Sequence, residues 1–136
     1  MALEAERRGS LFLLVQGGRL RRRRLTQALD LMTNITERQM LLLSLQRALL
    51  GEVHPQLRQV SIEADAVLHI VRLRFEYDGY PLDAVRGSCS CAATGVIADF
   101  SSPWQLDEQH LAVKAPSVLS PLSHVAYLRA EPQHGV

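Results

Sequence analysis

A change of hydrophobic period within residues 68–100 restricts the fold of this chain more than any other feature. Up to Asp78, apolar side chains alternate with charged ones, which is the period of a strand with one buried face. After Pro81 they recur every three or four residues, the period of an amphipathic helix. Asp78 and Gly79 break the strand, and Pro81 suits the first turn of a helix. The segment therefore predicts a strand, a tight turn and a helix that folds back on the strand. The apolar residues concerned are Val71, Leu73, Phe75 and Tyr77 in the strand, and Leu82, Val85, Cys89, Ala92 or Ala93, Val96 and Phe100 in the helix.

Two glycines weaken the helical half of this prediction. Gly87 and Gly95 each cost about 1 kcal/mol relative to Ala inside a helix. The alternative is a break at Gly87, with a shorter helix that begins near Cys89.

Another helix is predicted to begin at Thr36. Thr36 suits the N-cap and Gln39 completes a capping box, while Ile35 and Met40 take the positions of a hydrophobic staple. Gly51 is a suitable residue just past its end. We expect this helix to be largely covered by the rest of the domain, through one wide apolar stripe. The stripe consists of Leu41, Leu45, Ala48 and Leu49, widened by Leu42, Leu43 and Leu50.

The remaining elements are predicted to be strands. Residues 57–62 form a first strand, and the polar break at residues 63–66 is short enough to make an antiparallel hairpin with the central strand. Residues 104–114 and 123–129 contain a third and a fourth strand. The sequence thus predicts an α+β, two-layer domain: an antiparallel four-stranded sheet with two helices, in the order α-β-β-α-β-β.

The charge distribution divides the chain. The formal net charge is +1, yet residues 1–31 hold seven arginines against three acidic residues, a net of +4, and residues 32–136 hold eight basic and eleven acidic residues, a net of −3. We expect residues 1–35 to be a disordered or loosely helical basic leader. Residues 36–131 should form a single α+β domain, and residues 132–136 a tail.

The leader leaves several interpretations open. Its apolar run, residues 11–15, is far shorter than the ~20 residues that a membrane span needs. Gly17, Gly18 and an arginine-rich block follow the run without a good cleavage site, so we expect neither a secretory signal nor membrane insertion. Residues 19–24 could act as a basic arm that makes the protein a nucleic-acid accessory factor. The domain itself does not suggest nucleic-acid binding, because it is mildly acidic and the chain has only 5% aromatic residues.

The two cysteines do not predict a disulfide or a metal site. Cys89 and Cys91 would point about 200° apart on a helix, so they cannot bridge each other. Their spacing is not that of a zinc site, and we expect no metal and no cofactor. Free thiols favour a reducing compartment, the cytoplasm. A small thiol- or histidine-dependent enzyme or ligand-binding domain that uses Cys91 or His69 is an alternative, which rapid thiol labelling would reveal.

The turn after the central strand holds the candidate site. Glu76, Asp78 and Asp83 are its carboxylates, and Tyr77 or Tyr80 could supply an aromatic anchor for a protein partner. The same carboxylates could instead do acid–base work or simply be solvated turn residues. No phosphate-binding loop, nucleophile elbow or HExxH motif occurs in the sequence, so we predict no catalytic residue and no enzyme activity.

Five short segments carry a resemblance to known proteins: Leu49-Leu50-Gly51-Glu52-Val53, Leu57-Arg58, Arg74-Phe75-Glu76-Tyr77-Asp78-Gly79, Cys91-Ala92-Ala93-Thr94 and Val96-Ile97-Ala98-Asp99-Phe100. With these segments the chain resembles single-domain cytoplasmic antitoxins or immunity proteins of secreted bacterial toxins. The likeness covers residues 38–130. It implies a non-enzymatic domain that binds a toxin-like protein partner, and it says nothing of the oligomeric state. After Gly79 the chain departs from the acid-rich pattern of such proteins, since residues 80–86 hold a single carboxylate, Asp83.

The arginine-rich composition of residues 1–31 also fits translation from a misassigned upstream start, with Met32 as the true first residue. In that alternative the native protein begins at Met32 and residues 1–31 are absent from it. Intact-mass measurement of the native protein tests this alternative, and a mass that includes residues 1–31 would contradict it.

Overall fold

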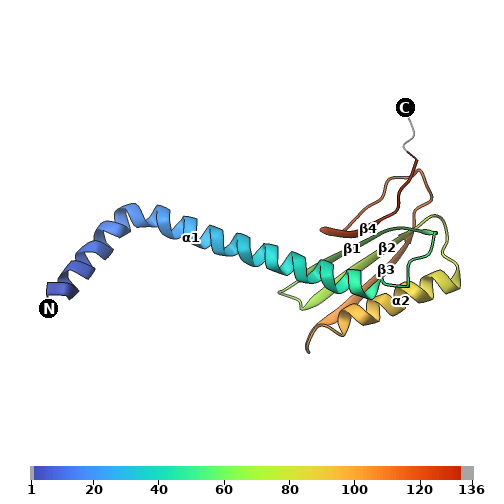
Figure 1. Ribbon diagram of the computed structural model, residues 1–136, viewed down its shortest axis with the longest axis horizontal. Coiled ribbons are helices and arrows are strands. Elements are labelled where there is room, and N and C mark those ends of the chain that lie inside the picture. Colours follow the sequence, from blue (N-terminus) through green and yellow to red (C-terminus); the bar gives the residue numbers. More distant parts are fainter. Residues whose placement is uncertain (1, 133–136) are drawn as a thin grey trace. The chain divides into compact units, whose positions relative to one another are not determined.

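The computed structural model describes the backbone of residues 2–132 and the side chains of residue 22 and of most residues up to 132. The chain divides into two compact units, residues 1–37 and 38–136, and the first helix has residues in both. The sheet and the other helix belong to the second unit (Figure 1). The elements are α1 (Ala2–Ala48), β1 (Leu57–Asp65), β2 (Ile70–Tyr77), α2 (Asp83–Ile97), β3 (Gln105–Ala112) and β4 (His124–Leu128).

The α+β class and the order of elements along the chain are confirmed, and β1 and β2 form the predicted antiparallel hairpin. The purely antiparallel sheet is wrong. β3 runs parallel to β2, and the order of strands in space, β3-β2-β1-β4, differs from their order along the chain. The physical reason is the length of α2. Its 15 residues span ~22 Å, nearly the length of an eight-residue strand, and so return the chain to the end where β2 began.

The core confirms the change of period at mid-chain. All four inward residues of β2 are fully buried, and α2 buries one stripe against them, while the end of α1 lies on the same side of the sheet (Figure 1). Two predicted members of that stripe lie outside α2: Leu82 precedes the helix and is exposed, and Phe100 follows it and is half-buried. The buried residues of β2 and α2 are Val71, Leu73, Phe75, Tyr77, Val85, Cys89, Ala92, Ala93 and Val96.

The helix starts differ from the predicted ones. Thr36 does not cap α1: it lies inside the helix and donates a hydrogen bond from Oγ1 to the carbonyl oxygen of Met32, at 2.8 Å. α2 starts at Asp83, so the shorter helix from Cys89 is wrong. Gly95 has a packing role, since a Cβ there would lie 3.3 Å from the Cβ of Ala48 on α1.

α1 is less covered than we predicted. Its buried residues in the second unit are Leu41, Ser44 and Leu45, whereas Met40 and Leu43 are exposed. The apolar run at residues 11–15 and most of the arginine run lie outside the described side chains, apart from Arg22 and Arg24, which are exposed. Over residues 2–132, no helix combines the length and the apolar character that crossing a membrane requires.

The hairpin turn also falls later than predicted. The polar residues Glu63–Asp65 continue β1, and the turn occupies Ala66–His69. The carboxylate of Asp65 accepts hydrogen bonds from the backbone N–H groups of Val67 and Leu68, both at 3.0 Å. This local bonding holds the turn and leaves Val67 exposed.

One segment covers part of the polar face of the sheet. β3 and β4 lie at opposite edges, so their connection, residues 113–123, has to pass over β2 and β1. We call these residues the strap. Arg74 and Glu76 alternate with the core residues of β2, so their side chains point to the polar face of the sheet. There both side chains form hydrogen bonds with Ser120 of the strap.

Glu76 is the most deeply buried of these supports. Its side chain has no exposed surface, and its two carboxylate oxygens accept hydrogen bonds from Gln59 Nε2 at 3.0 Å and from the backbone N–H of Ser120 at 2.7 Å. A buried carboxylate is tolerated only where such donors replace water. Glu76 therefore fixes the strap to the sheet.

We predict that Glu76→Ala lowers the free energy of unfolding by about 3 kcal/mol, because it leaves the Gln59 amide and the Ser120 N–H without acceptors. Glu63→Ala is the control on the same sheet face, where a half-exposed carboxylate lies 3.9 Å from Arg72; we expect less than about 1 kcal/mol. Urea denaturation measures both changes. Equal stability losses would contradict the anchoring role of Glu76.

Candidate partner-binding site

The loop between β2 and α2 is held by one side chain from a distant part of the sequence. Gln56 Nε2 donates to the carbonyl oxygen of Tyr80 at 2.6 Å and to that of Asp78 at 3.4 Å. Gln56 Oε1 accepts from the backbone N–H of Leu82 at 3.0 Å. Gly79, with φ of +82°, supplies the left-handed residue of the turn. The loop thus has fixed ends and a fixed backbone.

The loop presents apolar surface to solvent. The Tyr80 side chain is 85% exposed and Leu82 is 68% exposed, although both backbones are bonded to Gln56. Asp83 is exposed in the first turn of α2. We call Tyr80, Leu82 and Asp83 the rim. A rigid, exposed tyrosine beside an exposed leucine is the composition of a protein-binding surface.

Two residues of the predicted site lie inside the domain. Glu76 and Tyr77 both have no exposed surface, so neither can touch a partner in this structure. Glu76 supports the strap. The Tyr77 hydroxyl lies 2.6 Å from His110 Nδ1, and burial raises the pKa of Tyr77.

Asp78, another residue of the predicted site, supports neighbouring segments. Its carboxylate accepts hydrogen bonds from the backbone N–H of Ala115 at 2.9 Å and from Arg129 Nη2 at 3.1 Å. These two donors hold the pKa of Asp78 below its usual value. Through this one carboxylate, the loop that bears Tyr80 is joined to the strap and to the end of β4.

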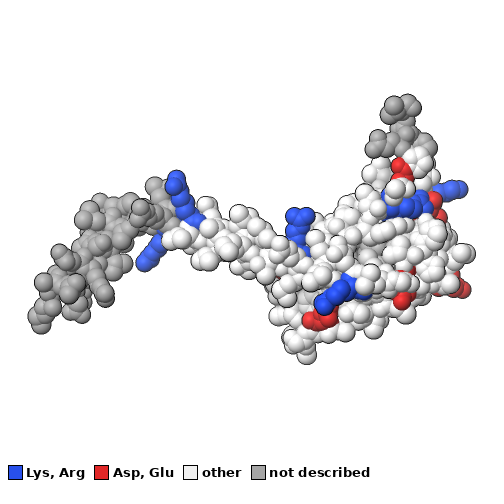
Figure 2. Space-filling view, viewed as in Figure 1, with Lys and Arg blue, Asp and Glu red and all other residues white. Residues whose placement is uncertain are grey.

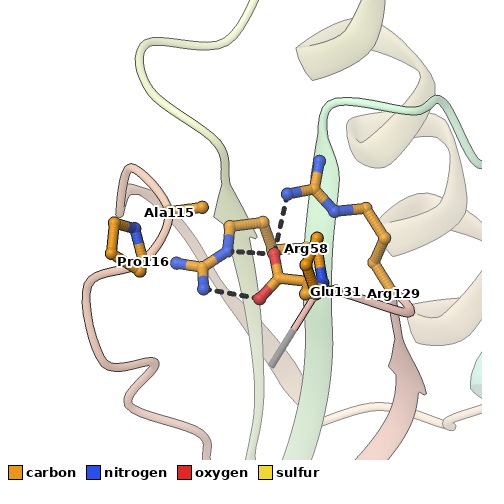
Figure 3. A pocket seen from close by; sticks show the side chains of 6 residues that line it. Arg58, Ala115, Pro116, Arg129 and Glu131 are labelled. Carbon is orange, nitrogen blue, oxygen red and sulfur yellow. Dashed lines mark hydrogen bonds and ion pairs between the residues drawn. The ribbon is translucent and has the colours of Figure 1, made fainter. Parts of the chain in front are cut away.

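Arg129, which binds Asp78, belongs to a cluster of two arginines and one carboxylate. Figure 3 shows the three side chains, Arg58, Arg129 and Glu131. Glu131 accepts hydrogen bonds from Arg58 Nε and Nη2 and from Arg129 Nη2, all at 2.7 Å. These bonds lower the pKa of Glu131 to about 2, with Arg58 contributing most. A pocket of about 250 Å³ opens here, lined by Arg58, Ala115, Pro116, Arg129, Glu131 and Pro132.

This pocket does not offer a free cation for an anionic ligand. Arg58 is 3% exposed, and its Nη1 also donates to the carbonyl oxygens of Val113 and Ser117. Arg129 shares its guanidinium between Glu131 and Asp78. Two positive charges face two negative ones, so the cluster ties together the start of β1, the strap and the end of β4.

The two cysteines and His69 differ in their surroundings. Both cysteines are free, as predicted, but Cys89 is fully buried and burial raises its pKa to about 11, which keeps it protonated. Cys91 and His69 are exposed, and His69 packs edge-on against Trp104. In the described part of the chain no group of three or more histidine, cysteine or acidic side chains could hold a metal ion.

His110 lies on β3. Its ring nitrogen Nε2 is buried and lacks a hydrogen bond among the described residues. Its ring stacks on Phe75 and Tyr77, and burial lowers its pKa, so the neutral form is favoured. The nearest carboxylate, that of Glu108, is 3.5 Å from Nε2. With Tyr77 on its other nitrogen, His110 is part of the packing between β2 and β3.

Charges of both signs are mixed over the second unit. On the face shown in Figure 2, lysine and arginine side chains lie close to aspartate and glutamate side chains. Arg72, for example, lies within 3.9 Å of carboxylate oxygens of Glu63, Asp65 and Asp107. Opposite charges this close together largely cancel, so they produce little electrostatic potential to attract a partner from a distance.

The sequence predicted Tyr80 and Asp83 of the rim, but not Leu82 or the residues that support the loop. Leu82 was assigned to the buried stripe of the helix, and Gln56 and Arg129 were not considered. Gln56 is 24 residues from Tyr80, and Arg129 is 51 residues from Asp78. Nothing in the local pattern signals these contacts, because only the closure of the sheet brings the segments together.

The second unit is a small α+β domain with an exposed apolar loop whose backbone is held by Gln56. The sequence profile of the family described as MafI2 immunity protein matches residues 38–131, and the chain belongs to this family. The resemblance to toxin immunity proteins is thereby confirmed. A comparison with curated proteins gave no significant match.

We predict that Glu131→Gln lowers the free energy of unfolding by on the order of 2 kcal/mol at neutral pH, because it leaves the buried Arg58 guanidinium without a counter-charge. The folded-state pKa of Glu131 is about 2, below its ordinary 4.5. The stabilisation is therefore complete above pH 4.5 and is lost as the pH falls towards 2. Urea denaturation of both proteins at several pH values should show this difference shrinking below pH 4.5. A constant difference would contradict the assignment.

Proposed function

We propose that this protein is an immunity protein that neutralises a bacterial toxin by binding it, and that the rim contacts the toxin. The observation that carries the proposal is the Gln56 clamp, which fixes the backbone beneath a tyrosine that is 85% exposed. Membership of the MafI2 immunity protein family supports a toxin as the partner.

The clamp matters for affinity. A flexible loop loses conformational entropy when it binds, about 0.5–1.5 kcal/mol for each immobilised side chain with many rotamers, and more for its backbone. Gln56 holds the backbone of Tyr80 and Leu82 before any partner arrives. Tyrosine itself adds a large contact area with few torsions to fix.

The rim is the centre of the proposed interface and not all of it. A stable protein complex buries roughly 800 Å² on each partner, more than three side chains provide. Leu50 and Val53, exposed in the segment that leads to Gln56, extend the apolar surface. Asp83 contributes a single negative charge, which suits a basic group on the toxin.

We further propose that the protein acts without catalysis in the bacterial cytoplasm. Exposed Cys91 and buried Cys89 are both reduced, and this state is stable in a reducing compartment. The buried thiol has a raised pKa and is therefore a poor nucleophile. Binding of the toxin then has to account for the whole protective effect.

The direct test starts from the toxin-like gene that we expect beside the gene of this protein; its product is expressed with and without the protein and then purified for calorimetry. The wild type should restore growth and bind the toxin at 1:1 stoichiometry. Tyr80→Ala should weaken binding by roughly 30-fold, the effect of losing a central aromatic anchor. Leu68→Ala is the control, because Leu68 is 60% exposed on the hairpin turn at the opposite end of β2.

Two results would reject the proposal. If the wild type neither protects cells nor binds the toxin, the proposed function is wrong. If the wild type binds and Tyr80→Ala binds as tightly as Leu68→Ala, the function stands and the rim is not the contact surface. Circular dichroism confirms that each variant is folded.

A further inference from the structure

We propose that the strap is a second toxin-contacting element, which inserts the side chain of Val118 into an apolar depression of the toxin. The inference rests on the proposed function, because it concerns how the same partner is held. It adds a contact surface that is separate in sequence from the rim and that has its own support.

The strap's backbone is bonded inward to the sheet. Five side chains of the two central strands and of the turn after β2 make six hydrogen bonds to its N–H and carbonyl groups. Arg58 donates to the carbonyl oxygens of Val113 and Ser117, and Arg74 donates to that of Ser120. Asp78 accepts from the N–H of Ala115, Glu76 from that of Ser120, and Ser61 from that of Leu122.

The supports make the strap rigid. Glu76 and Ser61 have no exposed surface, and Arg58 is 3% exposed. Lifting the strap would leave these polar groups without partners, at a cost of about 1–3 kcal/mol for each neutral group and more for the charged ones. The strap is therefore preorganised, in the same way as the loop held by Gln56.

Because the backbone bonds face the sheet, the strap's side chains are free to face outward. Val118 is 90% exposed, the largest exposed fraction among the described large hydrophobic residues. Pro116 and Ser117, just before it, are exposed as well. A rigid backbone that projects an apolar side chain suits a concave apolar partner surface.

The composition of the strap favours a protein surface over an anionic ligand. Residues 113–123 contain a single charged residue, Lys114. Nucleic acid would require a cluster of basic side chains. An apolar tip with one cation near its start fits an apolar depression that has a carboxylate on its border.

The strap and the rim are mechanically connected. Asp78 lies two residues before Tyr80, and its carboxylate accepts the hydrogen bond from Ala115 in the strap. Both elements are therefore at the end of the sheet where β2 finishes, and one partner can contact both. Two fixed apolar projections, Tyr80 and Val118, would set the orientation of the toxin.

The test measures binding of the purified toxin to Val118→Asp, with Val67→Asp as the matched control. Both positions are highly exposed valines, 90% and 88%, and Val67 is on the hairpin turn at the other end of β2. A carboxylate at either position leaves the fold intact. We expect Val118→Asp to weaken binding by roughly 30-fold and Val67→Asp by less than about 3-fold.

A second variant tests the role of rigidity. Ser61→Ala removes the acceptor for the Leu122 N–H and leaves every exposed strap residue unchanged. Toxin dissociation should become several-fold faster, and hydrogen exchange at Leu122 should accelerate in the free protein. Faster exchange with unchanged dissociation would show that strap rigidity does not serve binding.

The outcomes separate this inference from the proposed function. If the wild type does not bind the toxin, the function itself fails. If the wild type binds, Tyr80→Ala binds weakly and Val118→Asp binds as tightly as Val67→Asp, the rim stands and the strap inference is overturned.

Discussion

The structure of the second unit depends on a carboxylate buried beneath a loop. Glu76 is the second-last residue of β2, and its neighbours Phe75 and Tyr77 are in the core, so its side chain has to face the opposite side of the sheet. There the strap covers it and supplies the N–H of Ser120 as a donor. One residue thus links the two sides of the domain: its backbone belongs to the sheet over the core, and its side chain holds the covering loop.

The parallel pairing of β2 and β3 makes such a loop necessary. Because α2 returns the chain to the edge beside β2, β3 and β4 end up on opposite edges, and the chain has to cross the sheet to reach β4. The core face is already occupied by α1 and α2. The crossing is therefore made on the polar face, where Arg58, Arg74 and Ser61 can satisfy the backbone groups of the strap.

Hydrogen bonds from polar side chains also hold the proposed binding surface in place. Gln56 fixes the loop that bears Tyr80, while Asp78 and the Arg58–Glu131–Arg129 cluster fix the beginning of the strap and the end of β4. Polar side chains bind backbone groups, and apolar side chains are left in solvent. For an immunity protein this division is useful, since the contact surface is held in place before the toxin binds.

The sequence by itself determined the strand and the helix at mid-chain, the chain order of the elements and the resemblance to immunity proteins. Period, turn residues and short motifs are local, and local sterics and burial impose them. The tertiary structure alone decided the direction of β3, the burial of Glu76 and Tyr77, and the exposure of Tyr80 and Val118. The four predicted site residues other than Tyr80 show what local sequence cannot predict. All four are acidic or aromatic and lie near a turn. In the structure Glu76 and Tyr77 are buried, Asp78 holds the strap, and Asp83 is exposed. Those differences arise from Gln56, Ala115, Ser120 and Arg129, which are distant in sequence and meet only when the sheet is assembled.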